Sequence, residues 1–398
     1  MYSELSMNSL SLRIDQLRTR RQFWLKIHLY LGLFAGAILV LIGLTGSILV
    51  FWQEIDGWLN PQLIEVKTPV SSEIEYRPLT EIVEAAKNAV STRSTSLLIL
   101  YPNDENKPFW FTFYGSDDKA DTVNVFIDPY TAKVIGTRIW YHATNPLKHS
   151  LMGFIFKLHH SLLINENGLI IVGIVGVFLT ISVLTGLIVW WPLTGKWRQA
   201  LTIKRSLSVK RLNYDIHKTF GFYSTLVLMA LLVSGIYFNL PEQFVWLVER
   251  FSPVSKPKQF MSTPQNQSPV TIDRALNIVR ERYPNEKFYW FSTPNGERGS
   301  FVFTLHQQVA GLFTGRHQVV LDQYSGATLA DLSPSSGSSG QMFIQWQWSL
   351  HSGHALGMPG RILVLLAGLA CAVLYVTGVI RWLQKRRAKA QNQDRRLG

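Results

Sequence analysis

Four histidines are the residues of this chain whose spacing suggests chemistry. They lie at matching places in two halves of the sequence, as the pairs His28 and His217, and His159 and His351. Each member of the first pair lies four residues before a glycine, and each member of the second pair lies nine residues before one. Ionisable side chains at membrane segments are costly, so by default they are interpreted as functional. Four histidines in register therefore predict two paired sites.

The composition indicates a membrane protein with sizeable soluble parts. Hydrophobic residues make up 47% of the 398 positions and charged residues only 16%, which is too apolar for an ordinary soluble enzyme. Four apolar runs are long enough to cross a bilayer, since each crossing needs about 20 residues. The first run is too long, and the segment before it too polar, for a cleaved signal peptide, so we expect an uncleaved signal anchor.

The positive charge indicates the orientation. Residues 1–26, 192–216 and 381–398 hold 18 of the 39 Lys and Arg residues but only four of the 26 acidic residues. By the positive-inside rule these three segments are cytoplasmic, and both long loops lie outside. The pI of about 9.7 therefore records membrane topology, and nucleic acid is not an expected partner.

The two outer loops repeat each other. A helical pattern opens each loop, at residues 78–90 and 271–283, because apolar residues return at spacings of three and four. Strand-like segments follow, at residues 97–101, 108–114 and 122–127 and at 288–293, 300–305 and 318–321. A turn signature ends each set, beginning at Asp128 and at Asp322. The offset between the halves drifts only from 189 to 194 residues, which indicates one tandem duplication.

The predicted fold is an α-helical membrane protein, a four-helix transmembrane bundle with two outer α+β domains. The expected segments are a cytoplasmic N-terminus (1–23), four crossings (24–52, 165–192, 215–240 and 357–383), two α+β domains (53–146 and 241–340), two outer-face helices (147–164 and 341–356), a cytoplasmic loop (193–214) and a basic cytoplasmic tail (384–398).

The duplication predicts how the histidines pair. Each half has two crossings, so the halves are parallel repeats related by an axis along the membrane normal. His28 and His217 should then face each other near the cytoplasmic surface, and His159 and His351 near the outer surface. Opposed imidazoles from facing helices of a bundle are a natural frame for haem. The chain has one cysteine, Cys371, and no C-x-x-C-H motif, so any haem is held without covalent attachment.

Glycines near the first histidine pair favour a flat cofactor. Gly32 and Gly221 lie one helical turn from His28 and His217, where a missing side chain would leave space for a macrocycle. The alternative is that small residues simply let helix backbones approach. Four further pairs are assigned to helix packing: Thr45-Gly46, Thr185-Gly186, Ser234-Gly235 and Thr377-Gly378.

Further histidines complicate the choice of ligands. His160 and His354 lie beside the second pair but out of the repeat, so they rank below His159 and His351 as ligands. Four histidines without matched partners are interpreted as surface residues: His142, His149, His306 and His317.

The chain resembles the PepSY-associated transmembrane proteins that include FoxB-like and PiuB-like ferric-siderophore reductases. The resemblance covers nearly the whole chain and is carried by four motifs: His28-Leu-Tyr-Leu-Gly32, Leu158-His159-x-x-Leu162, Trp190-Trp191-Pro192 and Leu350-His351-Ser-Gly353. It implies a bacterial inner-membrane protein with two periplasmic PepSY-like domains. It also implies two b-type haems, each between two histidines, that pass electrons to a ferric siderophore or another Fe(III) chelate outside.

The electron donor is expected to be a separate molecule. The chain has no G-x-G-x-x-G motif, and its cytoplasmic loop is too short for a dinucleotide-binding unit. A cytoplasmic reductase, a soluble reductant or quinol would supply electrons. Two other classes stay open: a regulatory protein that binds peptides would leave the spaced histidines unexplained, and a proton or metal transporter would lack acidic residues inside the apolar runs.

Overall fold

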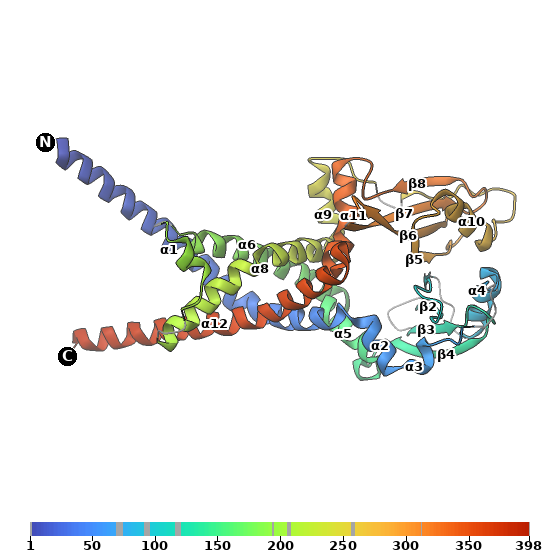
Figure 1. Ribbon diagram of the computed structural model, residues 1–398, viewed down its shortest axis with the longest axis horizontal. Coiled ribbons are helices and arrows are strands. Elements are labelled where there is room, and N and C mark those ends of the chain that lie inside the picture. Colours follow the sequence, from blue (N-terminus) through green and yellow to red (C-terminus); the bar gives the residue numbers. More distant parts are fainter. Residues whose placement is uncertain are drawn as a thin grey trace. The chain divides into compact units, whose positions relative to one another are not determined.

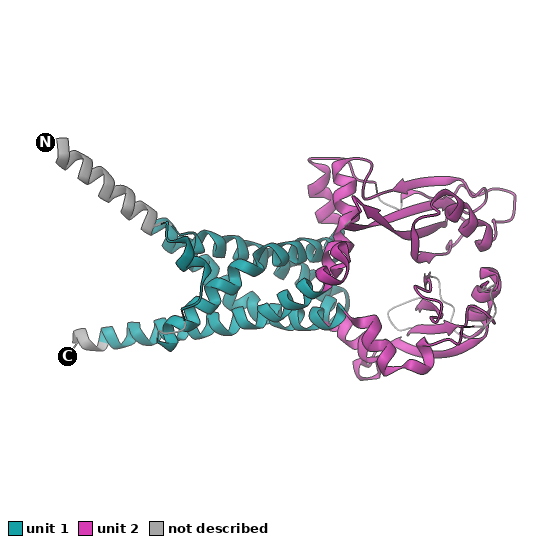
Figure 2. Cartoon of the chain, in the orientation of Figure 1, with its two compact units in different colours: residues 1–50, 159–241, 362–398 teal, residues 51–158, 242–361 magenta. Residues whose placement is uncertain are grey.

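The computed structural model describes residues 2–68, 75–90, 96–115, 121–192, 195–204, 208–255, 259–311 and 313–397. The chain forms two compact units, coloured separately in Figure 2. We name them the helical unit (residues 1–50, 159–241 and 362–398) and the α+β unit (residues 51–158 and 242–361).

Four long helices account for the apolar runs (Figure 1): α1 (Tyr2–Leu49), α6 (Asn165–Trp190), α8 (Val209–Asn239) and α12 (Gly357–Leu397). Each contains a stretch long and apolar enough to cross a membrane, and each of the four expected crossings falls on one of them. These helices fit a multi-pass membrane protein.

Close packing holds the helical unit together. Helix α6 packs against both α1 and α8, with Ala35 of α1 in the apolar cluster between them. The Ser47 hydroxyl on α1 lies 3.0 Å from the Leu365 carbonyl oxygen on α12. A side chain at Gly43 would collide with Cys371, because a Cβ added there would lie 2.9 Å from the Cys371 Cβ. Small residues thus let the backbones approach, as is usual for helices in membranes.

The α+β unit contains an antiparallel sheet of eight strands in the order β4-β3-β2-β1-β5-β6-β7-β8. The strands are β1 (Ser96–Leu100), β2 (Phe109–Tyr114), β3 (Thr122–Ile127), β4 (Val134–Tyr141), β5 (Lys287–Ser292), β6 (Ser300–Val309), β7 (Phe313–Asp322) and β8 (Thr328–Leu332). The sequence predicts two separate domains, but β1 pairs with β5, with Leu98 opposite Ser292 and Leu100 opposite Trp290. This pairing gives hydrogen-bond partners to the backbone at one edge of β1 and one edge of β5, edges that two separate domains would leave unpaired.

Helices α4 (Leu79–Asn88) and α10 (Ile272–Arg282) contribute to one core that runs through both halves of this sheet. The sequence places both helices within one or two residues. Asp273 links them, because its carboxylate accepts hydrogen bonds from the Leu79 and Thr80 amides at 2.5 and 3.0 Å. The backbone amides at the start of α4, which have no partner within their own helix, thus find a hydrogen-bond acceptor on α10 in the second half of the chain.

Several short elements are not predicted by the sequence: α2 (Trp52–Leu59), α3 (Pro61–Ile64), α9 (Pro241–Glu249), β4 and β8. The first expected outer-face helix is also shorter than residues 147–164, since a 3-10 turn, η1 (Pro146–Lys148), precedes α5 (Leu151–Ser161). The second is α11 (Ser339–Ser352), followed by the 3-10 turn η3 (His354–Leu356). A buried ion pair ties α2 to β4: the Arg138 guanidinium donates to both Asp56 carboxylate oxygens at 2.8 and 2.7 Å.

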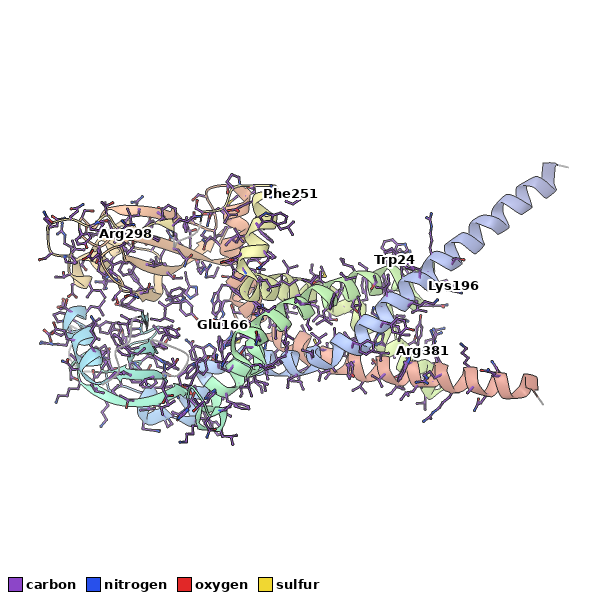
Figure 3. All side chains as sticks on the ribbon, turned by 180° about the vertical axis from the view of Figure 1, so that it is seen from behind. Trp24, Glu166, Lys196, Phe251, Arg298 and Arg381 are labelled. Carbon is purple, nitrogen blue, oxygen red and sulfur yellow. The ribbon has the colours of Figure 1, made fainter. Side chains whose placement is uncertain are left out.

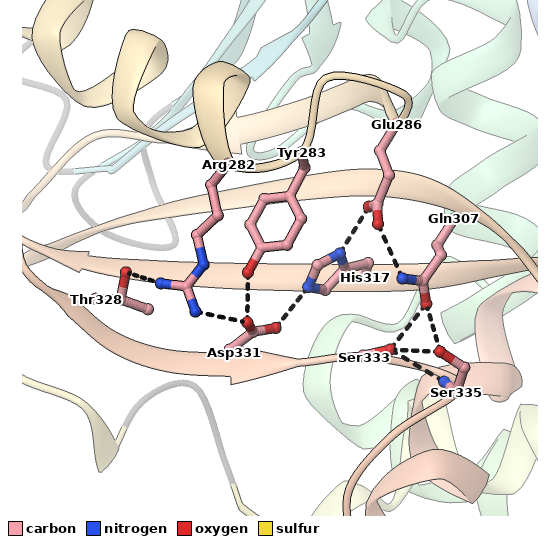
Figure 4. A network of polar contacts seen from close by, with 9 residues as sticks. All are labelled: Arg282, Tyr283, Glu286, Gln307, His317, Thr328, Asp331, Ser333 and Ser335. Carbon is pink, nitrogen blue, oxygen red and sulfur yellow. Dashed lines mark hydrogen bonds and ion pairs between the residues drawn. The ribbon is translucent and has the colours of Figure 1, made fainter.

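A buried histidine on β7 connects several polar side chains near β8 (Figure 4). The His317 side chain is 1% exposed, and its two ring nitrogens lie 2.6 Å from Glu286 Oε2 and 2.7 Å from Asp331 Oδ1. Asp331 also accepts hydrogen bonds from Tyr283 and Arg282. Both ring nitrogens face carboxylate acceptors, an arrangement that favours the doubly protonated imidazolium. The prediction that His317 is a surface residue is wrong, because its carboxylate partners come from segments distant in sequence.

The surroundings of His317 make the α+β unit sensitive to pH. Burial alone would lower the pKa of His317, but its hydrogen bonds with Glu286 and Asp331 raise that pKa above the ordinary value of 6.5. The stabilisation of the α+β unit by protonated His317 is therefore complete below about pH 6.5. It is lost as the pH rises through the folded-state pKa of His317. We expect amide exchange protection of β7 and β8 to fall as the pH rises above about 6.5 and through the folded-state pKa of His317, after correction for the intrinsic exchange rate.

His317→Gln should remove this pH dependence and destabilise the unit by roughly 1–3 kcal/mol, less than a fully buried pair because Asp331 is partly solvated. Strands β2 and β3 serve as the internal reference in the same exchange experiment. An equal loss of protection in those strands would contradict the assignment to His317.

Candidate functional site

The structure brings His28 and His217 together. His28 lies on α1 and His217 on α8, and their ring centroids are 6.1 Å apart with planes inclined at 68°. The two residues are 189 positions apart in the sequence, so the helix packing alone creates this pair.

Each of these rings is held through its Nδ1 atom. His28 Nδ1 lies 2.8 Å from the Ser182 carbonyl oxygen on α6, and His217 Nδ1 lies 3.0 Å from the Leu374 carbonyl oxygen on α12. A carbonyl oxygen only accepts, so each Nδ1 carries the proton and each Nε2 keeps its lone pair. A metal-ligating histidine usually donates its second ring N–H in this way.

A glycine on the neighbouring helix lies against each ring, and at Gly186 the missing side chain leaves the space that the ring needs. A Cβ added at Gly186 would lie 2.9 Å from His28 Cε1, and one at Gly378 would lie 3.4 Å from His217 Cε1. The Thr377 hydroxyl also lies 2.9 Å from His217 Nδ1. The Thr-Gly pairs are therefore packing residues, as the sequence indicates, but what they pack against is the histidine rings.

His159 is held in the same manner. Its ring, on α5, lies against Gly46, where an added Cβ would be 2.9 Å from His159 Cε1. His159 Nδ1 is 3.0 Å from the Ile42 carbonyl oxygen and 3.2 Å from the Thr45 hydroxyl on α1. In all three cases the carbonyl lies four residues before the glycine, and a threonine directly precedes the glycine. A single local motif thus seats three of the four matched histidines.

A cavity of about 1060 Å³ in the helical unit is lined by His28, His217, Gly32 and Gly221. The two glycines leave room there: a Cβ at Gly32 would meet only Ser182 Oγ at 3.9 Å, and one at Gly221 only Leu374 Cδ2 at 3.6 Å. Most of the other lining residues are aliphatic, such as Leu29, Leu33 and Leu179, aromatic, such as Trp190 and Phe222, or basic, such as Arg21, Arg211 and Arg381. The cavity is therefore apolar within, carries basic residues, and offers two imidazoles.

The pair His28 and His217 offers a metal two imidazole ligands. Among the described residues, no group of three or more His, Cys, Asp or Glu side chains could hold a metal ion. A metal at this pair would therefore take its remaining ligands from outside the protein, as iron in a macrocycle does.

The chain matches the PepSY-associated TM region family over residues 25–385, a range that includes all four matched histidines. The chain belongs to this family. No curated protein matches it.

The second expected pair of this PepSY-associated TM protein is divided between the two units. His159 belongs to the helical unit and His351, on α11, to the α+β unit, so their pairing stays a prediction. His160 accepts a hydrogen bond at its backbone carbonyl from Asn239 at 3.0 Å. His354 faces His306, with ring centroids 6.4 Å apart.

His306 is a second wrong surface assignment. Its Nδ1 atom is buried, and burial, followed by the charges of His354 and Lys287, lowers the pKa of His306 to about 4. No local pattern indicates this burial, because the ring is covered by residues from other elements, among them Tyr289 at a ring-centroid distance of 4.5 Å.

A buried acidic residue near His217 is not predicted by the sequence reasoning. The Asp215 carboxylate is fully buried and lies 3.0 Å from Lys218 Nζ and 3.3 Å from Arg211 Nε. The available signal is the lysine three residues later on the same helix, a spacing that favours ion pairing. These two cations compensate the charge of the buried Asp215 carboxylate.

The basic segments gather at one end of the helical unit. Figure 3 labels Trp24, Lys196 and Arg381 there and Glu166 toward the other end. This arrangement agrees with the charge distribution from which the orientation is predicted.

The glycines that lie against the rings of His28 and His217 allow a matched test in this PepSY-associated TM protein. Gly186→Ala should push against the His28 ring and destabilise the helical unit by about 1–3 kcal/mol through overpacking. Gly378→Ala is the control, since its Cβ would make ordinary contact with His217, and both variants share the same gain in helix propensity. Thermal unfolding in detergent measures the difference, and equal shifts of both variants would contradict the seat.

Proposed function

We propose that this protein is an inner-membrane di-haem b electron-transfer protein. It would reduce ferric siderophores or other Fe(III) chelates on the periplasmic side, and so support iron acquisition as a FoxB-like or PiuB-like reductase. The observation that carries the proposal is the His28–His217 pair: two imidazoles with Nε2 lone pairs beside one apolar cavity.

The spacing of the pair fits two histidines that would hold one metal between them. With metal–nitrogen bonds of about 2 Å, two imidazoles sharing one metal have ring centres roughly 6 Å apart, against the observed 6.1 Å. The family is also associated with haem-binding membrane proteins. The cavity has room for a macrocycle beside Gly32 and Gly221, and four arginines line it: Arg21, Arg211, Arg381 and Arg386.

Each residue of the site has a defined task. His28 and His217 would ligate the iron, and the carbonyls of Ser182 and Leu374 hold their rings in the ligating tautomer. The arginines would pair with the haem carboxylates. When bound, haem supplies one-electron transfer. With two histidines holding the iron, the haem would exchange electrons and would not bind dioxygen or the chelate directly.

The second haem would be ligated by His159 and His351. His159 supports this role, because its seat reproduces that of His28 and His217. A ferric chelate outside would then accept the electron. The donor on the cytoplasmic side would be a reductase or quinol, because the chain carries no nucleotide motif.

Haem content tests the proposal directly. Protein purified under haem-replete conditions should show a low-spin b-type spectrum with about two haems per chain, given two bis-histidine sites. It should also oxidise anaerobically when mixed with ferric siderophores after reduction with dithionite. A colourless preparation would rule the proposal out.

His217→Ala should remove the inner haem, leave about one haem per chain, and block reduction by a cytoplasmic-side donor. His142→Ala, at a histidine without a matched partner in the repeat, is the control and should keep both haems. Loss of both haems in His217→Ala would argue against two separate sites.

A further inference from the structure

A further pair of imidazoles, distinct from the two predicted haem-ligand pairs, lies within the α+β unit. His306 is on strand β6 and His354 begins the turn η3, and their ring centroids are 6.4 Å apart with planes inclined at only 24°. The separation is close to the 6.1 Å between His28 and His217. No part of the proposed electron-transfer function uses this pair.

His306 differs from other histidines of the unit in its hydrogen bonding. His317 and His149 each engage a ring nitrogen in a hydrogen bond, whereas His306 Nδ1 is buried and has no hydrogen-bond partner among the described residues. The ring has two other rings near it, Tyr289 at a centroid distance of 4.5 Å and His354 at 6.4 Å. A buried polar atom without a partner requires a specific explanation, such as an ion that binds there.

His354 is oriented with one nitrogen available. Its Nδ1 lies 2.9 Å from the Ser352 hydroxyl, which leaves Nε2 as a possible ligand. Gly353 holds the position, since it adopts a φ of 79°, and a Cβ there would lie 2.8 Å from the Arg361 Cα. The turn is therefore tightly constrained, as a ligand-bearing segment needs to be.

Two cations and one anion are the charged groups near His306 and His354. Lys287 lies directly across from His306 in the sheet. Arg361 is the cation that acts on His354, and it pairs with Glu54 at 2.6 Å. Of these three charged groups one cation is left uncompensated. It repels a bare trivalent ion more strongly than a divalent one, and it favours an ion that keeps an anionic ligand in an open position.

We propose that His306 and His354 form a binding site for a divalent transition-metal ion. Imidazole suits iron, zinc, copper and nickel, and two protein ligands leave positions open for water or for oxygen atoms of a chelate. If the protein is a ferric-chelate reductase, and the choice of ion rests on that proposed function, the natural occupant is Fe(II), the ion that a chelate releases after reduction. The site would then receive the product three residues from the predicted ligand His351.

The site is a property of one half of the chain. At the 192-residue offset that relates His159 to His351, the positions matching His306 and His354 hold Tyr114 and Leu162. The pair is therefore not part of the repeat that predicts the haem ligands, and it can be altered without touching them.

Isothermal titration of the full-length, haem-loaded protein with Zn²⁺, a redox-inert probe, tests the site. Wild type should bind one equivalent at this site, and His306→Gln and His354→Gln should each weaken that binding by about tenfold or more, as expected for loss of one of two ligands. His142→Gln is the matched control and should bind as wild type. Anaerobic titration with Fe²⁺ should give the same order of variants.

Binding that survives in both variants, or no binding in wild type, would overturn the proposal. The two variants lie on different elements, so a folding defect in one leaves the other as a test, and an unchanged haem spectrum confirms that each is folded. Failure of the two proposals is distinguishable: a colourless protein that binds Zn²⁺ through this pair would refute the haem assignment alone, and a haem-loaded protein that does not would refute only this site.

Discussion

A histidine among apolar helices must give its N–H to an acceptor, and in this protein the acceptor is the backbone of a neighbouring helix. Helix carbonyls are normally occupied by their own helix, so a ring can reach one only where the approach is very close. Glycine makes that approach possible, and a threonine beside it adds a second polar contact at His217 and His159. The orientation of each ring, and hence the direction of its other nitrogen, follows from this one interaction.

The same interaction determines which helices must be neighbours. His28 on α1 requires α6, His159 on α5 requires α1, and His217 on α8 requires α12. The bundle is therefore specified by polar contacts as well as by the small-residue packing of Gly43 against α12. In a medium where apolar contact does not distinguish one helix from another, such contacts provide the specificity.

Sequence reasoning predicts the elements that carry strong periodicity. The four crossings, α4, α10 and six of the strands follow from hydrophobic patterns within single segments. Strand β4 is not predicted because Gly136 and Arg138 interrupt its hydrophobic pattern, and its contacts are with other segments: it pairs with β3, and Arg138 forms an ion pair with Asp56. The seats of the histidines, and the burial of His306 and His317, depend on contacts between residues far apart in sequence, which no local pattern records.

The β1–β5 pairing has a consequence for how the chain is made. The strand at residues 96–100 precedes α6 and its partner at 287–292 follows α8, so the sheet closes only when both segments reach the same side of the membrane. An even number of passes must separate them, and a chain in which only one of α6 and α8 inserts cannot complete the sheet. During synthesis one edge of β1 stays unpaired until β5 has been made and has reached the same side of the membrane. Pairing of β1 with β5 therefore requires correct insertion of both α6 and α8.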